Sequence, residues 1–311
     1  MDLVIQENES ALVIGTFGRA IWILDDLLSL RDIINKNSKS KIIALSKNPA
    51  VQVKGIFIAP PGNIWTGFHT TYEGENREFQ KIKIPFYLND KVSEMDSIYS
   101  IIKNDKNQPI QRLVKNNLDE GLNYLVWKLD EKMVTLPGSW INQESRGIPV
   151  LPGVYTAELN YKNETIRSEI MVIQDPRFEV DIDVDENLFS FQKRAVEQVK
   201  RLSNILNELN RFIKIIEASS FSEKRKKQLL LEIRKIQLKA RDQLENRQLG
   251  AWKSNKITAY SVLNNTIKVS RARLRKPSAQ DESLLSMAKE LIDEVEEDII
   301  DFKSKKIKEL N

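Results

Sequence analysis

The sequence predicts a protein of several domains that contains both α and β structure. Its first fifty residues hold two short apolar runs, and the following stretch alternates polar and apolar side chains with a period of two. From Asp183 onward, apolar side chains recur every three or four positions. These patterns are typical of a buried strand pair, half-buried strands and amphipathic helices, respectively. We expect domains at residues 1–50, 51–178 and 179–311.

Composition narrows the classes of function. The 311 residues include 48 basic and 44 acidic side chains, a net charge of +4 spread along the chain, so a nucleic-acid partner is not expected. There is no cysteine, and His69 is the single histidine, which excludes a disulfide framework, a catalytic thiol and an imidazole metal cluster. No apolar run approaches the roughly 18 residues of a membrane span, and no export signal opens the sequence, so we expect no membrane span.

The first predicted element is a strand pair, Ala11 to Thr16 and Ala20 to Leu24, joined by a glycine-containing turn. Its core residues are apolar at every position instead of at every second one. A strand that is apolar on both faces is one that is buried on both sides. Because nothing nearby in the sequence would cover two faces, we expect this pair to belong to a sheet completed from elsewhere.

The middle of the chain predicts a β-sandwich. A connector rich in Lys, Asn and Ser is followed by strands with alternating side chains, separated by turn signals such as Pro137-Gly138 and Pro152-Gly153. Several short half-buried strands at this spacing indicate an antiparallel sandwich of immunoglobulin-like type. The core-facing side chains are expected to be Ile82, Ile84, Phe86, Leu88, Leu125, Trp127, Leu129, Tyr155, Ala157, Leu159 and Tyr161.

The last third of the chain predicts an all-α region. Asp183, with a glutamate three residues later, predicts the capped start of one long helix, and Ser220 predicts the start of a second that runs to about Leu244. Pro277 precedes a last helix at residues 281–306. We expect a long-helix hairpin with a third helix packed along it.

One segment carries a family resemblance. DLVIQENESALVIGTFGRAIWILDDL is similar to the last propeller repeat of bacterial sortilin-like or bacterial-neuraminidase-repeat (BNR) glycosyl hydrolases, which show a strand, Gly-Thr-His-Gly-Arg, a second apolar strand and an Asp pair. The histidine is replaced here by Phe17, so the role of that imidazole is not carried over. The matching positions are Gly15, Thr16, Gly18, Arg19, Asp25 and Asp26.

The resemblance continues through the rest of the chain. The order of GLNYLVWKLD, LPGVYTAELNY and VIQDPRFEV resembles the sandwich that follows the propeller in that family, and NNTIKVSRARLRKPSAQDESL resembles its Asn-Asn helix, Pro-containing loop and final helix. It implies that residues 1–50 are the end of a propeller blade plus a connector. Upstream propeller blades, in the same or a separate chain, are then the partners. The parent protein is expected to be extracellular or periplasmic and this chain, which lacks a signal peptide, a fragment of it.

The family-motif residues have a structural interpretation. Asp25 and Asp26 are a carboxylate pair, as glycoside cleavage requires, but neighbours on an extended chain point to opposite sides, so we interpret them as a turn or cap. Gly15, Gly18 and Arg19 lack the helix and lysine of a phosphate loop, and Arg19 is expected to tie the turn to a carboxylate or carbonyl. No catalytic, cofactor-binding or metal-binding residue is predicted.

Aromatic residues supply the candidate ligand surface. Trp65, Phe68, His69 and Tyr72 gather in a glycine-containing stretch, and Trp140 lies in a separate insertion. Aromatic side chains of this kind stack on sugars, although packing against their own strands is the interpretation that we favour.

Two basic runs have acidic neighbours. Residues 224–227 lie close to Glu223 and Glu232, and the run at 271–276 is followed by Asp281 and Glu282. We interpret both runs as solvated helix faces and not as a nucleic-acid surface.

These observations predict a non-catalytic accessory and structural region, which braces a propeller or presents a carbohydrate- or protein-binding surface. One alternative is a part of a glycoside hydrolase whose catalytic residues lie mainly upstream, and it rests on the family name alone. Another is an interaction module whose amphipathic helices pair with a different chain.

Overall fold

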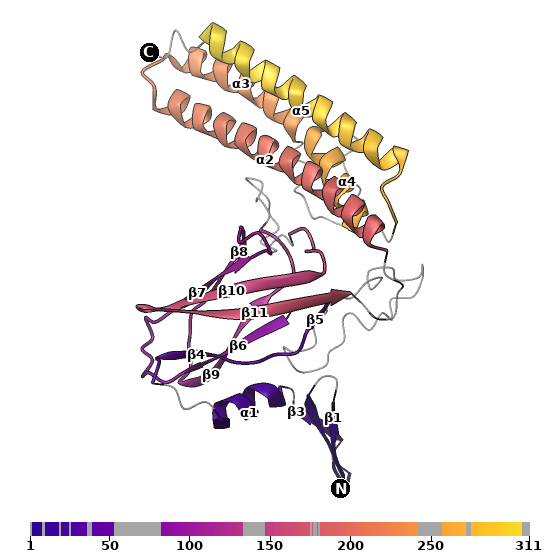
Figure 1. Cartoon of the computed structure of the whole chain (residues 1–311). Coiled ribbons are helices and arrows are strands. Elements are labelled where there is room, and N and C mark those ends of the chain that lie inside the picture. Colours follow the sequence, from indigo (N-terminus) through magenta and orange to yellow (C-terminus); the bar gives the residue numbers. More distant parts are fainter. Residues whose placement is uncertain are drawn as a thin grey trace. The chain divides into compact units, whose positions relative to one another are not determined.

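A computed structural model of the chain (Figure 1) describes residues 2–7, 10–18, 20–24, 26–35, 39–52, 82–132, 147–174, 176, 179, 181–241, 257–271 and 275–306. The mixture of sheets and helices agrees with the predicted α and β content. The chain divides into two compact units. The first comprises Met1–Lys132 and Pro149–Val180, and the second Met133–Ile148 and Asp181–Asn311.

The first unit begins with an antiparallel sheet, here named the N-terminal sheet, in the order β1-β2-β3. Its strands are β1 (Asp2–Gln6), β2 (Ala11–Gly15) and β3 (Ile21–Leu24). The predicted pair corresponds to β2 and β3, each one residue shorter than expected. The sequence-based prediction lacks β1, although its run from Leu3 to Ile5 has the same apolar character as the centre of β2.

Helix α1 (Leu27–Asn35) connects the N-terminal sheet to the strands that follow. The carboxylate of Asp32 accepts a hydrogen bond from the backbone N–H of Ser46 at 2.6 Å. This side chain therefore attaches the helix to the segment between β4 (Ile42–Ala44) and β5 (Ala50–Gln52).

The described strands of the middle region form two further sheets. A three-stranded sheet has the order β4-β6-β9, and a five-stranded sheet has the order β5-β11-β10-β7-β8. The additional strands are β6 (Ile82–Leu88), β7 (Ile98–Lys103), β8 (Pro109–Lys115), β9 (Gly121–Trp127), β10 (Gly153–Tyr161) and β11 (Glu164–Gln174).

One strand pair departs from the predicted antiparallel arrangement. Strand β5 pairs with β11 in parallel, with Ala50 opposite Val172. The chain passes from the small sheet to the large one between β4 and β5, and it reaches the edge of β11 running in the same direction. The sequence could not indicate this, because β5 has three residues and no alternating pattern of its own.

Both sheets contribute side chains to one hydrophobic core. Trp127 is fully buried there, its indole N–H donates to the carbonyl of Asp130 at 2.9 Å, and its ring meets that of Tyr155 edge-on at 5.4 Å. The Tyr155 hydroxyl donates to the carbonyl of Leu151 at 2.7 Å. Both polar aromatic atoms thus keep a partner when the rings leave water, which is what makes their burial favourable.

The second unit is a bundle of α2 (Ile182–Ala218), α3 (Glu223–Ala240), α4 (Ala259–Arg271) and α5 (Ala279–Lys306). Helices α3 and α4 pack along successive lengths of α2 and share one core with α5 (Figure 1). The expected hairpin with a third helix is therefore wrong in one respect, since α4 adds a helix. Its 13 residues are too short for the apolar period to stand out in the sequence.

The two predicted helix starts are each displaced by two residues. Asp181 caps α2, accepting from the N–H of Val184 at 3.1 Å, and Ser222 caps α3. Asp183 lies inside the first turn of α2, where its carboxylate pairs with Lys276. Ser220 lies before the cap. In both places two residues that can cap a helix lie two positions apart, and the sequence spacing does not show which of them is the cap.

Ion pairs join α2 to α5 along much of their length. Arg194 pairs with Glu282 at 2.6 Å, and Arg201 with both Asp293 and Glu296, each at 2.6 Å. Residue numbers rise together on the two helices, so α2 and α5 run in the same direction. These partly exposed pairs orient the helices, whereas the buried core between them supplies most of the stability.

Ser100 and Ser168 offer a test of the two-sheet core. The Ser100 hydroxyl is buried in β7 without a hydrogen-bond partner in the described part of the chain, whereas Ser168 is buried in β11 and accepts from Lys47 Nζ at 2.6 Å. We expect Ser100→Ala to leave the free energy of unfolding unchanged or raise it, and Ser168→Ala to lower it by about 1 kcal/mol. Urea denaturation followed by circular dichroism measures both. Equal losses would contradict this account of the two hydroxyls.

Candidate functional site

The N-terminal sheet presents two apolar faces. Directly paired residues of neighbouring strands share a face. The register places Leu3 opposite Ile14, and Ile14 opposite Trp22, on one face. It places Val13 between Val4 and Ile23 on the other. The sequence-based expectation of strands that are apolar on both sides therefore holds for the paired sheet.

Neither face is covered by the described residues. On the first face the side chains of Trp22 and Leu3 are 63% and 57% exposed, and on the second those of Ile21 and Val4 are 69% and 56% exposed. Asp2 is the sole charged residue within the three strands. An exposed apolar surface with so few charges is characteristic of a site where another protein surface packs.

The turn between β2 and β3 holds most of the family-motif residues. Gly18 has a φ of +75°, a conformation that glycine adopts without strain. Thr16 closes the turn, since its hydroxyl donates to the carbonyl of Ala20 at 2.8 Å. Phe17 is 98% exposed. Gly15 ends β2, and Arg19, whose tie to a carboxylate or carbonyl was expected, lies outside the described residues.

Asp26 has the contacts of a helix cap. Its carboxylate accepts from the backbone N–H of Ser29 at 3.2 Å and from the Ser29 hydroxyl at 2.5 Å, and its φ of +64° turns the chain from β3 into α1. Both carboxylate oxygens are thus engaged by the first turn of the helix. Asp25 lies outside the described residues, so the geometry of the carboxylate pair is not defined.

The candidate ligand surface of aromatic residues is not defined either. Every member of it falls outside the described part of the chain: Trp65, Phe68, His69, Tyr72 and Trp140. Carbohydrate binding by these residues stays a prediction from the sequence.

Three described residues of the basic runs lie close to acidic side chains. Lys226 lies 3.6 Å from the carboxylate of Glu223, and Lys276 pairs with Asp183. Arg275 lies 3.7 Å from Asp281. For these three residues the contacts agree with the interpretation of solvated helix faces with acidic neighbours.

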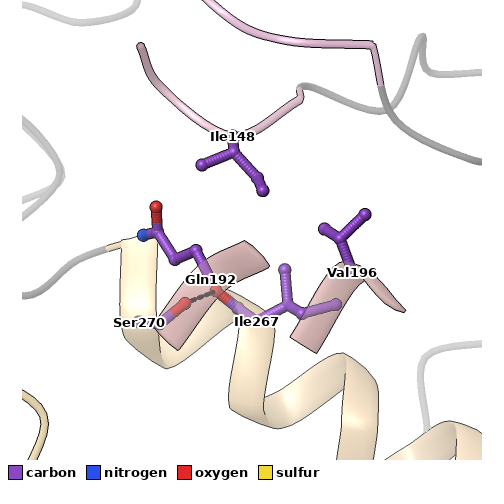
Figure 2. Close-up of a pocket in the computed structure, with 5 residues that line it drawn as sticks. All are labelled: Ile148, Gln192, Val196, Ile267 and Ser270. Atoms are coloured by element: carbon purple, nitrogen blue, oxygen red, sulfur yellow. Dashed lines mark hydrogen bonds between the residues drawn. The ribbon is translucent and has the colours of Figure 1, made fainter. Parts of the chain in front are cut away.

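Figure 2 shows a small hollow in the second unit, between α2, α4 and Ile148. Its volume is about 10 Å³, enough for roughly one water molecule and far too small for a sugar. Ser270 at its wall donates to the carbonyl of Ile267 at 2.8 Å. The remaining wall residues are Gln192 and Val196.

Lys47 has a lowered pKa that the sequence did not indicate. Its ammonium donates to the Ser168 hydroxyl at 2.6 Å and to the Glu169 carbonyl at 2.5 Å, both of them neutral oxygens. Burial lowers the pKa of Lys47 to about 8, and the charge of Glu169 opposes that shift. No sequence signal could have found it, because the effect depends on Lys47 reaching β11 across 121 residues of chain.

The described residues offer little else of chemical interest. No group of three acidic or histidine side chains among them could hold a metal ion. None of their helices combines the length and apolar character needed to cross a bilayer.

Comparison with known proteins adds no assignment. No family model matches the chain, and no curated protein matches it. The N-terminal sheet is therefore the candidate site on the strength of its own geometry.

The capping role of Asp26 can be separated from a catalytic one. Asp26→Ala removes both acceptors from the first turn of α1, and we expect the α1 amides to exchange with solvent roughly fivefold faster, as the loss of about 1 kcal/mol implies. Asp26→Asn keeps an acceptor and tolerates the positive φ, so its exchange should remain close to that of the parent chain. Mass-spectrometric hydrogen exchange measures both, and equal rates in Asp26→Ala and the parent chain would contradict the cap.

Lys47 predicts a pH dependence of stability. Its folded pKa of about 8 lies below the ordinary value of 10.5, so the unfolded chain binds more protons between these values. Unfolding therefore becomes less favourable as pH rises from about 8 to 10.5, and the contribution is lost as pH falls through 8. Relative to Lys47→Met, the parent chain should gain on the order of 2 kcal/mol over this range. Parallel urea titrations at the two pH values measure it, and identical pH profiles would contradict the shift.

Proposed function

We propose that this chain is the non-catalytic C-terminal accessory and structural region of a secreted β-propeller protein of the sortilin-like, BNR-repeat type. In this proposal the N-terminal sheet is the last part of a propeller blade, and its partners are the propeller blades that precede it, in the same or a separate chain. The remaining parts brace the propeller or present a binding surface beside it.

The single observation that carries the proposal is the exposure of both faces of the N-terminal sheet. A propeller blade is a small antiparallel sheet packed between two neighbouring blades, so both of its faces must be apolar. An ordinary surface sheet has one polar face. Burying an exposed Leu, Ile or Trp side chain contributes roughly 1.5–3 kcal/mol, so packing several of them on each face would stabilise the assembly strongly.

The middle region is proposed to be an immunoglobulin-like sandwich. Two sheets around one core and a buried Trp127 packed on Tyr155 support this, whereas the parallel pairing of β5 with β11 differs from a purely antiparallel sandwich.

The alternative of an interaction module rested on apolar helix stripes that could pair with a different chain. The apolar stripe of α2 is buried in the bundle's own core, as the exposures of Leu202 and Leu209 (both 0%) show. A partner helix would have to bind other residues. The glycoside hydrolase alternative gains nothing from Asp26, whose two oxygens are taken up by Ser29.

The test is to measure apolar surface on the chain alone and on the chain joined to the propeller blades that the proposal places before it. The lone chain should bind a hydrophobic dye such as anilinonaphthalene sulfonate, and the joined protein should lose that binding because the two faces are covered. A lone chain that binds no dye and is as stable as the joined protein would overturn the proposal.

Matched variants locate the dye. Trp22→Thr combined with Leu3→Thr removes large side chains from one face of the sheet and should lower the dye fluorescence. Met95→Thr alters an apolar side chain that is even more exposed (95%) but lies outside the sheet, and it should leave the dye fluorescence unchanged. Equal effects of the two changes would place the bound dye elsewhere.

A further inference from the structure

The side-chain amine of Lys47 is held against two neutral oxygens. This half-buried residue lies between β4 and β5, and its Nζ donates to the Ser168 hydroxyl at 2.6 Å and to the Glu169 carbonyl at 2.5 Å. Other lysines of the chain meet carboxylates instead, as Lys103 does at 3.0 Å and Lys239 at 2.6 Å. The contacts of Lys47 are thus ones that an uncharged amine can make equally well.

The segment that carries Lys47 is fixed on both sides. Directly before it, the backbone N–H of Ser46 donates to the carboxylate of Asp32 on α1 at 2.6 Å. Directly after it, β5 pairs with β11 from Val172 to Gln174. The amine is therefore held at a defined place beside β11, and it is not the end of a freely moving surface side chain.

The geometry leaves the nitrogen lone pair of an uncharged Lys47 available. A neutral amine has two N–H donors and one lone pair, and the two oxygens on β11 can take up both donors. Burial favours this neutral form, lowering the pKa of Lys47 to about 8. An amine that is partly neutral near physiological pH, and partly reached by solvent, can act as a nucleophile.

We infer that Lys47 Nζ is a site of covalent modification, where a small acyl group carried as a thioester is transferred to form an amide. The nitrogen lone pair attacks the carbonyl carbon of the thioester, and the C–S bond breaks. The sulfur leaves with the bonding electron pair and takes the proton that the nitrogen releases, so the products are an amide and a thiol. This inference does not depend on the proposed function.

The surroundings of Lys47 favour an acyl group over other small modifications. An amide is uncharged, which suits a half-buried nitrogen next to Glu169. A carbamate formed from carbon dioxide would be an anion and would meet the carboxylate of Glu169. The amide keeps one N–H for the two oxygens on β11, so acylation would also remove one of the two hydrogen bonds that attach this segment to the strand.

The experiment uses the full chain and, as probe, the uncharged thioester S-acetyl-N-acetylcysteamine at pH about 7.5. Peptide mass spectrometry follows the acetylation of each lysine with time. Lys47 should react roughly tenfold faster than Lys106, although Lys106 is exposed in the turn between β7 and β8 and Lys47 is half-buried. If exposure alone sets the rate, Lys106 reacts first, and the inference is wrong.

Matched variants test the cause of the reactivity. Among the described charged groups, the Glu169 carboxylate is the one that raises the pKa of Lys47. Glu169→Gln, a change at an exposed side chain, should therefore speed the acetylation of Lys47 roughly twofold and leave Lys106 unchanged. Glu120→Gln makes the same change of charge at another exposed position and should alter neither rate. Circular dichroism checks that both variants keep the fold.

The parent chain supplies a second measurement that needs no variant. The acetylation rate of Lys47 should rise with pH and level off above about 8, where the amine is already neutral. A rate that still rises steeply near pH 10 would reject the lowered pKa as the cause. Equal effects of the two glutamate changes, or acetyl groups found on Ser168 in place of Lys47, would each overturn the assignment of this site.

Discussion

A sheet that is apolar on both faces needs two covers, and the N-terminal sheet has neither among the described residues. The hydrophobic effect makes this costly, because each large apolar side chain left in water forgoes roughly 1.5–3 kcal/mol. Hydrogen bonds within the sheet do not offset that loss, since their net contribution is small. The requirement for two covering surfaces is thus the physical constraint from which the proposed partner and its apolar chemistry follow.

The rest of the described chain has no such requirement. The two sheets of the middle region enclose their own core around Trp127, and the helices enclose a second core along α2. The Trp127 indole and the Tyr155 hydroxyl have backbone partners in the first of these cores, where the buried Ser100 hydroxyl has none among the described residues. Each region thus encloses its own apolar side chains, which is why the exposed N-terminal sheet stands out as the place where another surface is needed.

Much of this organisation follows from side-chain period. The alternation at Ile84, Phe86 and Leu88 and the helical stripe from Phe191 to Ile216 are properties of local sequence, and the corresponding side chains are buried. The features that the sequence did not indicate depend on contacts between distant segments. The parallel pairing of β5 with β11 and the lowered pKa of Lys47 both arise where residues about 50 meet residues about 170.

Helix caps also divide into one that local sequence indicated and one that it did not. Asp26 was expected to be a turn or cap, and its contacts with Ser29 are those of a cap, because an aspartate after a strand and before a helix has few other uses. The choice between Asp181 and Asp183 depended on where the helix axis begins, which spacing does not determine. For the N-terminal sheet, local sequence was sufficient to predict two apolar faces, since the apolar residues follow one another directly within each strand. What local sequence leaves open is the surface that covers it, because a covering surface depends on contacts with segments that the strands themselves do not encode.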